Sequence, residues 1–286
     1  MKKIALYFSM LFIAASCNSS SESAQNSEEK TTEETTSQVE ETTPKIVTKE
    51  ISYEANDTTM QGFMAKPGNI KENTPGVLVV HEWWGHNEHA RNKAKALAEL
   101  GYVAFAVDMY GDGKQASHPE DAGKFAGMVM QNIDEAQQRF NAAYSELTKV
   151  EGVNAEKIAA IGFCFGGSVV MTMANMGVDL KAVTAFHTGV AIPVMPEKGK
   201  LNTPILVCNG ADDPFVKPEQ KTTFKEAMDA TGVDYKFLDY PGVVHAFTNP
   251  GADTMGQKFN LPLAYNQKAD EKSWNEMKAF FEKHLN

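Results

Sequence analysis

The sequence has few of the residues that mark several common classes of protein. It contains three cysteines in 286 residues and no C-x-x-C pair, which argues against a disulfide framework and against a cysteine-based zinc or redox site. It has only two arginines, Arg91 and Arg139, no basic cluster, and a formal net charge of −10. These features argue against nucleic acid as a partner. Beyond the N-terminal segment, no run is apolar and long enough to span a membrane.

Residues 1–17 have the pattern of an export signal. A basic start precedes an apolar run from Ile4 to Ala15, which is too short to span a bilayer stably. The run ends in small residues directly before Cys17, and this ending resembles a bacterial lipoprotein signal, in which the cysteine becomes the lipidated N-terminus. An ordinary signal peptide with a chance cysteine is the alternative. We expect an exported cell-envelope lipoprotein, anchored through Cys17 on a periplasmic or outer-surface face.

Residues 18–45 form a polar segment with seven glutamates and no aromatic residue. Such a composition buries too little apolar surface to offset the chain entropy, so it predicts a disordered acidic tether. The remaining residues, 46–286, have a length typical of one domain. We expect this domain to be a monomer that meets the membrane only through the lipid anchor.

Apolar runs alternate with helical patterns throughout the predicted domain. Strands are predicted at 46–54, 58–66, 76–82, 102–108, 157–163, 181–187, 204–210 and 234–240. Helices are predicted at 87–100, 119–149 in two pieces, 166–176, 218–231 and 268–284. This alternation predicts an α/β fold with a mostly parallel central sheet and helices on both faces.

The stretch IGFCFGG, residues 161–167, lies where a predicted strand meets a predicted helix. This is the context of a G-x-nucleophile-x-G turn, in which Gly162 and Gly166 allow a strained backbone and close chain approach. The N-terminus of the helix favours a thiolate at Cys164, and the Phe165 N–H points toward a developing oxyanion. A glycine-rich turn with a structural cysteine is the alternative.

Two later segments supply an acid and a base. A predicted strand ends in CNGADDPFV, where Asp213 has the G-x-x-D spacing and Asp212 fits a turn role. The loop YPGVVHAFTNP then carries His245 before the last predicted helix. The order nucleophile, acid, base is typical of α/β-hydrolases. We predict that His245, oriented by Asp213, activates Cys164 to attack an ester or lactone carbonyl, giving a thioester that water hydrolyses.

The segment HEWWGHNEHA, residues 81–90, follows another predicted strand, where a second oxyanion donor should lie. Its three histidines, His81, His86 and His89, also suggest a metal site. No carboxylate-rich group is expected to face them, however, so we predict no metal site there.

The motifs HEWWG, GYVAFAVDMYG, IGFCFGG, NGADDPFV and GVVHAF occur in the order and spacing of the dienelactone hydrolase family. The chain resembles this family over nearly all of residues 50–285. The resemblance implies an α/β-hydrolase fold, no cofactor, and a triad of Cys164, Asp213 and His245.

The resemblance also implies roles for residues of the HEWWG segment. Trp83 would supply the second oxyanion N–H beside that of Phe165, and Glu82 would influence when the Cys164 thiolate forms. A carboxylate at a strand end, paired with a nearby lysine, is the alternative role for Glu82.

The sequence departs from the family where well-known members bind a substrate carboxylate with arginines. The matching positions are Asp112 and Asn249, and neither can form the bidentate fork that suits a carboxylate. Together with Trp84, Tyr110 and Lys114, they form the predicted substrate-binding set, in which Lys114 is the one nearby cation.

We therefore expect hydrolysis of neutral carboxylic esters or lactones. Two alternatives remain open from the sequence. The same site could transfer an acyl group to an alcohol or amine, or the fold could serve as a surface-tethered binding protein that has lost turnover.

Overall fold

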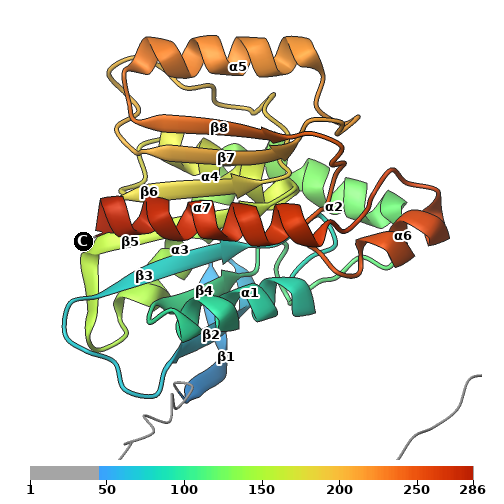
Figure 1. Cartoon of the computed structure of the whole chain (residues 1–286). Helices are drawn as coiled ribbons and strands as arrows, with labels where there is room; N and C mark the ends of the chain where they lie inside the picture. The colour runs from blue at the N-terminus through green and yellow to red at the C-terminus, as the bar shows by residue number, and fades with distance from the viewer. Residues whose placement is uncertain (1–44, 286) are drawn as a thin grey trace, which may run out of the picture. The chain divides into compact units, whose positions relative to one another are not determined.

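The computed structural model describes residues 45–285, which form an eight-stranded sheet with helices on both faces (Figure 1). The strand order is β1-β2-β4-β3-β5-β6-β7-β8. The α/β fold predicted from the alternating pattern is therefore confirmed. The predicted signal peptide, its Cys17 and the tether up to residue 44 lie outside the described residues. The strands are β1 (Ile46–Ala55), β2 (Thr58–Pro67), β3 (Thr74–Val80), β4 (Val103–Val107), β5 (Val153–Phe163), β6 (Ala182–Phe186), β7 (Ile205–Gly210) and β8 (Tyr235–Tyr240).

The sheet has an antiparallel edge and a parallel body. β1 pairs with β2 and β2 with β4 in antiparallel fashion, whereas β3 to β8 pair in parallel. The prediction placed the end of the third strand at Glu82, but β3 ends at Val80. The chain turns there because Gly85, at φ +94°, donates its N–H to the Glu82 carbonyl oxygen at 3.1 Å.

Helices cover the two faces of the sheet in separate sets. They are α1 (Glu88–Glu99), α2 (Pro119–Gln131), α3 (Ile133–Thr148), α4 (Phe165–Asn175), α5 (Pro218–Thr231), α6 (Ala252–Phe259) and α7 (Gln267–Leu285). Figure 1 shows α1 and α7 in front of the sheet. Asn87 caps the start of α1, where its side chain accepts the His89 N–H. The predicted split of 119–149 into two helices falls at Asn132.

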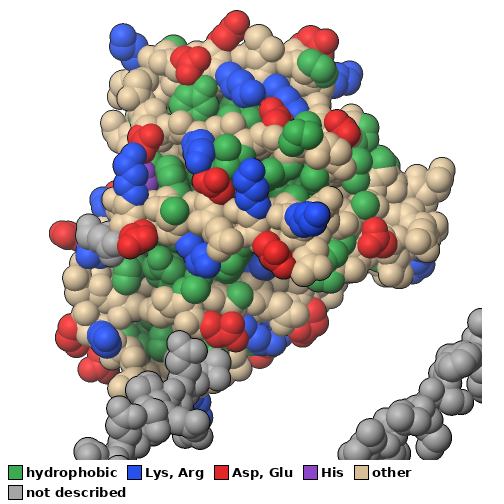
Figure 2. All heavy atoms as spheres, viewed as in Figure 1, with side chains coloured by type: hydrophobic (Ala, Val, Ile, Leu, Met, Phe, Trp, Pro, Cys, Tyr) green, Lys and Arg blue, Asp and Glu red, His purple; other side chains and the backbone are tan. Residues whose placement is uncertain are grey.

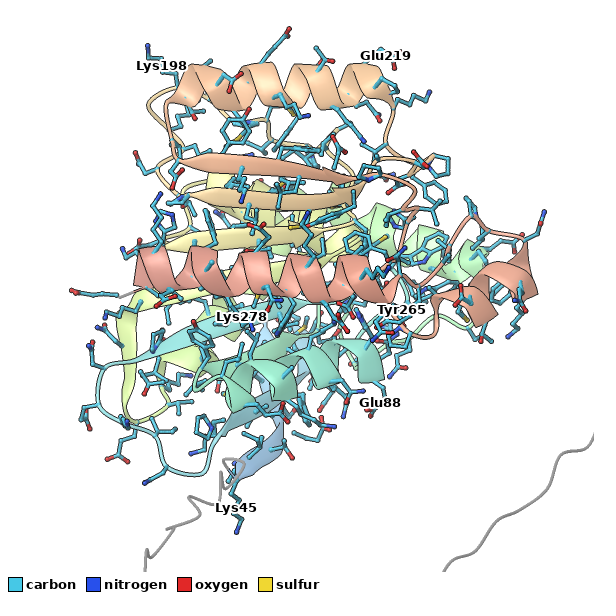
Figure 3. The ribbon with its side chains drawn as sticks, in the orientation of Figure 1. Lys45, Glu88, Lys198, Glu219, Tyr265 and Lys278 are labelled. Atoms are coloured by element: carbon cyan, nitrogen blue, oxygen red, sulfur yellow. The ribbon has the colours of Figure 1, made fainter. Side chains whose placement is uncertain are left out.

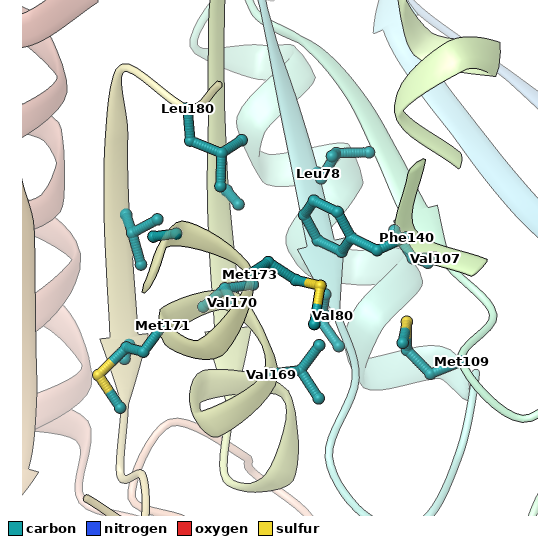
Figure 4. Close-up of a cluster of buried hydrophobic side chains, with 14 of the residues drawn as sticks. Leu78, Val80, Val107, Met109, Phe140, Val169, Val170, Met171, Met173 and Leu180 are labelled. Carbon is teal, nitrogen blue, oxygen red and sulfur yellow. The ribbon is translucent and has the colours of Figure 1, made fainter. Parts of the chain in front are cut away.

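The sheet separates two hydrophobic cores. One contains the buried faces of α1 and α7, including Leu97 and Phe281. The other packs β3 and β4 against α3 and α4, and Figure 4 shows Phe140 and Met173 meeting there beside Leu78. Hydrophobic burial on both faces explains why the parallel strands are almost continuously apolar.

The surface is charged and mixed in sign. Figure 2 shows lysine, arginine and acidic side chains interspersed over the visible face. Lys45, Glu88 and Glu219, labelled in Figure 3, are all exposed. None of the helices within residues 45–285 has the length and apolar character needed to cross a membrane.

The parallel body brings one set of loops together. β5, β7 and β8 point the same way, so the loops that follow them emerge at a single edge of the sheet. In open α/β sheets this edge is the usual place for a ligand. The three loops carry Cys164, Asp213 and His245 respectively.

Candidate active site

Cys164 occupies a sharp, strained turn between β5 and α4. Its backbone has φ 52° and ψ −115°, a conformation that L-residues rarely adopt. A Cβ at Gly162 would lie 2.1 Å from the Gly166 oxygen, and one at Gly166 would lie 2.3 Å from the Val80 oxygen. The turn therefore requires glycine at both positions, and it presents the cysteine at the end of the helix.

The predicted acid and the predicted base form a short buried pair. His245 Nδ1 lies 2.7 Å from Asp213 Oδ2, and the two residues are only 6% and 3% exposed. The other carboxylate oxygen of Asp213 accepts the Phe215 N–H at 2.9 Å. Asp212, the alternative acid, is exposed. Because Nδ1 is bound to Asp213, the opposite nitrogen of the ring, Nε2, is left for chemistry at Cys164.

The electrostatics of His245 depend on its neighbours. Burial lowers the pKa of His245, but the negative charge of the Cys164 sulfur and hydrogen bonds with Asp213 and Cys164 raise it more, and the net pKa is about 10. The protonated form of the His245 ring is therefore favoured at neutral pH, and its positive charge lies beside the Cys164 sulfur.

A cavity of about 250 Å³ opens beside this pair. Both Cys164 and His245 line it, as do Trp83 and Phe165. Within residues 45–285 no lysine or arginine side chain lines the cavity. The remaining lining residues, which the sequence prediction missed, are Ala126, Ser168, Gly189, Phe215 and Leu263.

Two of these missed cavity residues could have been predicted from the sequence. Ser168 lies one helical turn after Cys164, and Phe215 lies two residues after Asp213, so both could have been inferred from their neighbours. Ala126 on α2 and Leu263 after α6 reach the cavity only through tertiary packing. No local pattern marks them.

The predicted oxyanion residues lie against the same cavity. Phe165 is the first residue of α4, and the first N–H groups of a helix have no partner within it. Trp83 lies in the loop after β3, and its carbonyl oxygen accepts the Tyr110 hydroxyl at 2.9 Å. This hydrogen bond holds the peptide between Trp83 and Trp84, and the peptide that carries the Trp83 N–H is held at the Glu82 carbonyl, which accepts the Gly85 N–H at 3.1 Å.

The predicted substrate-binding residues lie elsewhere, and none of the five lines the cavity. Trp84 is buried against Trp83 and Phe259. Tyr110 is buried with its hydroxyl bound to the Trp83 carbonyl. Asp112 and Lys114 are exposed and pair with each other at 3.0 Å. The reason is a tight loop after β4 that turns these two side chains into solvent.

Asn249, the last of that set, binds Glu82 instead. Its Nδ2 donates to Glu82 Oε2 at 2.6 Å, and its Oδ1 accepts the Gly251 N–H at 2.9 Å. Glu82 is 2% exposed, and burial raises the pKa of Glu82 to about 7 despite the Asn249 hydrogen bond. Its nearest basic group is His89 Nδ1, at 3.8 Å. The geometry therefore favours Asn249 and His89, and not a lysine, as the partners of Glu82.

Two of the three histidines of the HEWWG segment form hydrogen bonds within the protein. His81 Nδ1 donates to the Glu82 carbonyl at 2.6 Å, and His81 Nε2 accepts the Met109 N–H at 3.3 Å. His89 Nε2 donates to the Thr248 carbonyl at 3.2 Å. No group of three or more His, Cys, Asp or Glu residues within 45–285 is arranged to hold a metal ion.

A further buried histidine lies behind the base. His187 follows β6 at φ 38°, with its ring 5.3 Å from that of His245 and its Nε2 2.8 Å from Thr248 Oγ1. Burial and neighbouring positive charge lower the pKa of His187 well below its usual range. It therefore stays neutral and supports the loop that carries His245.

Comparison with known proteins identifies the family. The model of the dienelactone hydrolase family matches residues 60–285. The chain is 30% identical to protein usf of Aquifex pyrophilus, over 82% of this chain and 98% of that protein. A protein of Aquifex aeolicus named as a carboxymethylenebutenolidase is 28% identical over the same shares.

Solved structures agree with these sequence matches. A dienelactone hydrolase-like promiscuous phosphotriesterase from metagenomic libraries is 31% identical, with a TM-score of 0.77 over 84% of this chain and 99% of that one. A dienelactone hydrolase structure from Klebsiella pneumoniae is 25% identical, with a TM-score of 0.70 over 83% and 98%. The chain therefore belongs to the dienelactone hydrolase family and is a hydrolase of that type.

Proposed function

We propose that the protein hydrolyses neutral carboxylic esters or lactones through Cys164, His245 and Asp213. The observation that carries this proposal is the 2.7 Å pair of His245 and Asp213 at the cavity that Cys164 lines. A nucleophile, a base and an orienting acid in this relation suit acyl transfer.

The reaction would proceed in two halves. The Cys164 thiolate attacks the carbonyl carbon, and N–H groups of Phe165 and Trp83 stabilise the oxyanion. The carbon–oxygen bond to the alcohol breaks, and His245 gives its proton to the leaving oxygen. Neutral His245 then takes a proton from water, which attacks the thioester, and the carbon–sulfur bond breaks to return the thiolate and release the acid.

The charges around the cavity support a neutral substrate. A buried carboxylate without a paired cation costs several kcal/mol. Arg91 pairs with Glu50, whereas Arg139 binds Glu135 and the Met109 carbonyl. Neither arginine is free for a substrate.

The test is hydrolysis of a panel of esters and lactones by the full chain, including a lactone carboxylic acid and its methyl ester. We expect higher kcat/KM for the methyl ester, and a loss of about 10⁴-fold in kcat for Cys164→Ala, His245→Ala and Asp213→Asn. Full activity in a folded Cys164→Ala protein would exclude the mechanism. Adding an alcohol or amine acceptor and analysing the products separates hydrolysis from acyl transfer.

We also propose that Cys17 carries the lipid anchor of an exported protein. Support comes from the basic and apolar N-terminal pattern, the small residues before Cys17, and the acidic segment 18–45. This proposal is independent of the chemistry at Cys164.

A further inference from the structure

Two apolar side chains, Phe215 and Leu263, line the cavity together with His245. The Phe215 ring meets the His245 ring edge-on, with centroids 5.0 Å apart and planes at 78°. Leu263 forms an isolated parallel β-bridge with His245, and the neighbouring Ala264 N–H donates to the His245 carbonyl at 3.2 Å.

Phe215 is unusual for its exposure. It is 49% exposed, although a large aromatic side chain gains most by burial. Of the four large hydrophobic residues that are exposed within the described part of the chain, Phe215 alone lines the cavity. A bound apolar group would cover this ring and remove it from water.

Both residues are held in fixed relation to the reacting groups. The Phe215 N–H binds Asp213 Oδ1 at 2.9 Å, so the ring is anchored two residues from the acid. The strand-like contact of Leu263 anchors it to the backbone of the base. The positions of Phe215 and Leu263 are therefore fixed by backbone contacts with Asp213 and His245.

The reaction chemistry indicates which portion of an ester substrate Phe215 and Leu263 would contact. His245 must reach the leaving oxygen in order to protonate it, so the alcohol portion of an ester lies on the His245 side of the cavity. The carbonyl oxygen lies toward the N–H groups of Phe165 and Trp83, and the acyl chain leaves the carbonyl carbon in another direction than the alcohol. We propose that Phe215 and Leu263 bind an apolar alcohol chain of the ester, and so select the leaving group. This inference rests on the proposed ester hydrolysis.

The experiment compares two ester series with the full chain. One series keeps an acetyl group and lengthens the alcohol from ethyl to hexyl, and the other keeps ethanol and lengthens the acyl chain. A fully buried methylene is worth about 0.8 kcal/mol, or about fourfold in kcat/KM. We expect kcat/KM to rise up to about fourfold per methylene in the alcohol series over the first few carbons, and to change far less in the acyl series.

Variants test whether Phe215 and Leu263 cause the expected rise of kcat/KM with the length of the alcohol. Phe215→Ala keeps the backbone N–H that binds Asp213, and Leu263→Ala keeps the backbone contact with His245. Each should flatten the alcohol series, so that kcat/KM no longer rises with the length of the alcohol, and Phe215→Leu should restore part of the slope. Met128→Ala is the matched control, because Met128 is 47% exposed on α2 and does not line the cavity.

Pre-steady-state kinetics exclude a merely structural role. All acetate esters pass through one acetyl thioester, so Phe215→Ala should slow acylation by long-chain esters and leave deacylation unchanged. The inference would be overturned if kcat/KM rose only with the length of the acyl chain. It would also be overturned if kcat/KM still rose with the length of the alcohol in both alanine variants. Either result would leave ester hydrolysis standing. Absence of hydrolysis in both series would instead overturn the proposed function.

Discussion

The backbone at Cys164 is the most constrained residue-scale feature of the site. Because a Cβ at Gly166 would lie 2.3 Å from the Val80 oxygen, Gly166→Ala should lower the free energy of unfolding by about 3 kcal/mol or more. Urea denaturation measures this. Gly123→Ala is the matched control, since nothing lies within 4 Å of its Cβ position on α2. That change should be stabilising by about 0.5–1 kcal/mol.

The charge of His245 should depend on Cys164. The net pKa of His245 is about 10 because the effects of Cys164 and of Asp213 together outweigh burial. In Cys164→Ala the charge and the hydrogen bond of the sulfur are absent, so we expect the pKa of His245 to fall well below 10. An NMR titration of the ring measures it, and an unchanged value would contradict this dependence on Cys164.

Glu82 should make stability depend on pH. Its folded-state pKa, about 7, lies above the unfolded value of 4.5, so its stabilising contribution is complete below pH 4.5 and is lost as the pH rises through 7. Glu82→Gln keeps an acceptor for Asn249 and removes this titration. At 1.36 kcal/mol per pKa unit, the variant should gain up to about 3 kcal/mol over the parent between pH 4.5 and 8.

Urea denaturation of both proteins at the two pH values checks this expectation. Glu156→Gln, at an exposed position, is the control and should track the parent throughout. If the free energy of unfolding of Glu82→Gln changed with pH as that of the parent does, the pKa of Glu82 would not be raised in the folded protein.

At the residue scale, motif spacing predicted the positions that local backbone geometry dictates. The turn at Cys164 and the choice of Asp213 over Asp212 both follow from strand ends and glycines. The partner of Glu82 did not follow. Asn249 lies 167 residues away along the chain, and only the folded sheet edge brings the two together.

The loop after β4 is held at the scale of an element by one buried carboxylate. Asp108 is fully buried, and it accepts four backbone N–H groups, from Gln61, Tyr110, Gly111 and Gly113. Asp108→Asn turns an acceptor into a donor that faces these N–H groups. We expect a loss of about 3 kcal/mol in the free energy of unfolding, measured by urea denaturation.

Asp112→Asn provides the comparison for this substitution in the same loop. Asp112 is 59% exposed, and its ion pair with Lys114 is a surface pair, which typically contributes less than about 1 kcal/mol. Equal effects of the two substitutions would show that the buried carboxylate does not anchor the loop.

Elements with strong local signals were predicted well. α5 begins at Pro218 and is followed by Gly232 in the left-handed region, and both residues are typical helix boundaries. α6 was missed, because only Ala252 and Gly256 are buried in its eight residues and no apolar stripe results. Its position depends on packing against the loop of Leu263, where a Cβ at Gly256 would lie 2.6 Å from the Leu263 oxygen.

At the scale of the whole molecule, the anchor and the hydrolase domain should be separable. Cys17→Ser removes the lipid acceptor, so we expect the protein to leave the membrane fraction or to stay unprocessed, with kcat/KM for soluble esters within about twofold of the parent. Membrane fractionation and mass spectrometry of the native N-terminus measure this. Cleavage elsewhere, without acyl chains, would refute the anchor.

The order of Cys164, Asp213 and His245 along the chain also sets when the proposed triad can assemble during synthesis. Cys164 emerges from the ribosome before Asp213 and His245, and β8 must join β7 before the last loop can reach the cavity. Until then no imidazole lies beside Cys164, so the proposed triad is complete only after the C-terminal strands have joined the sheet.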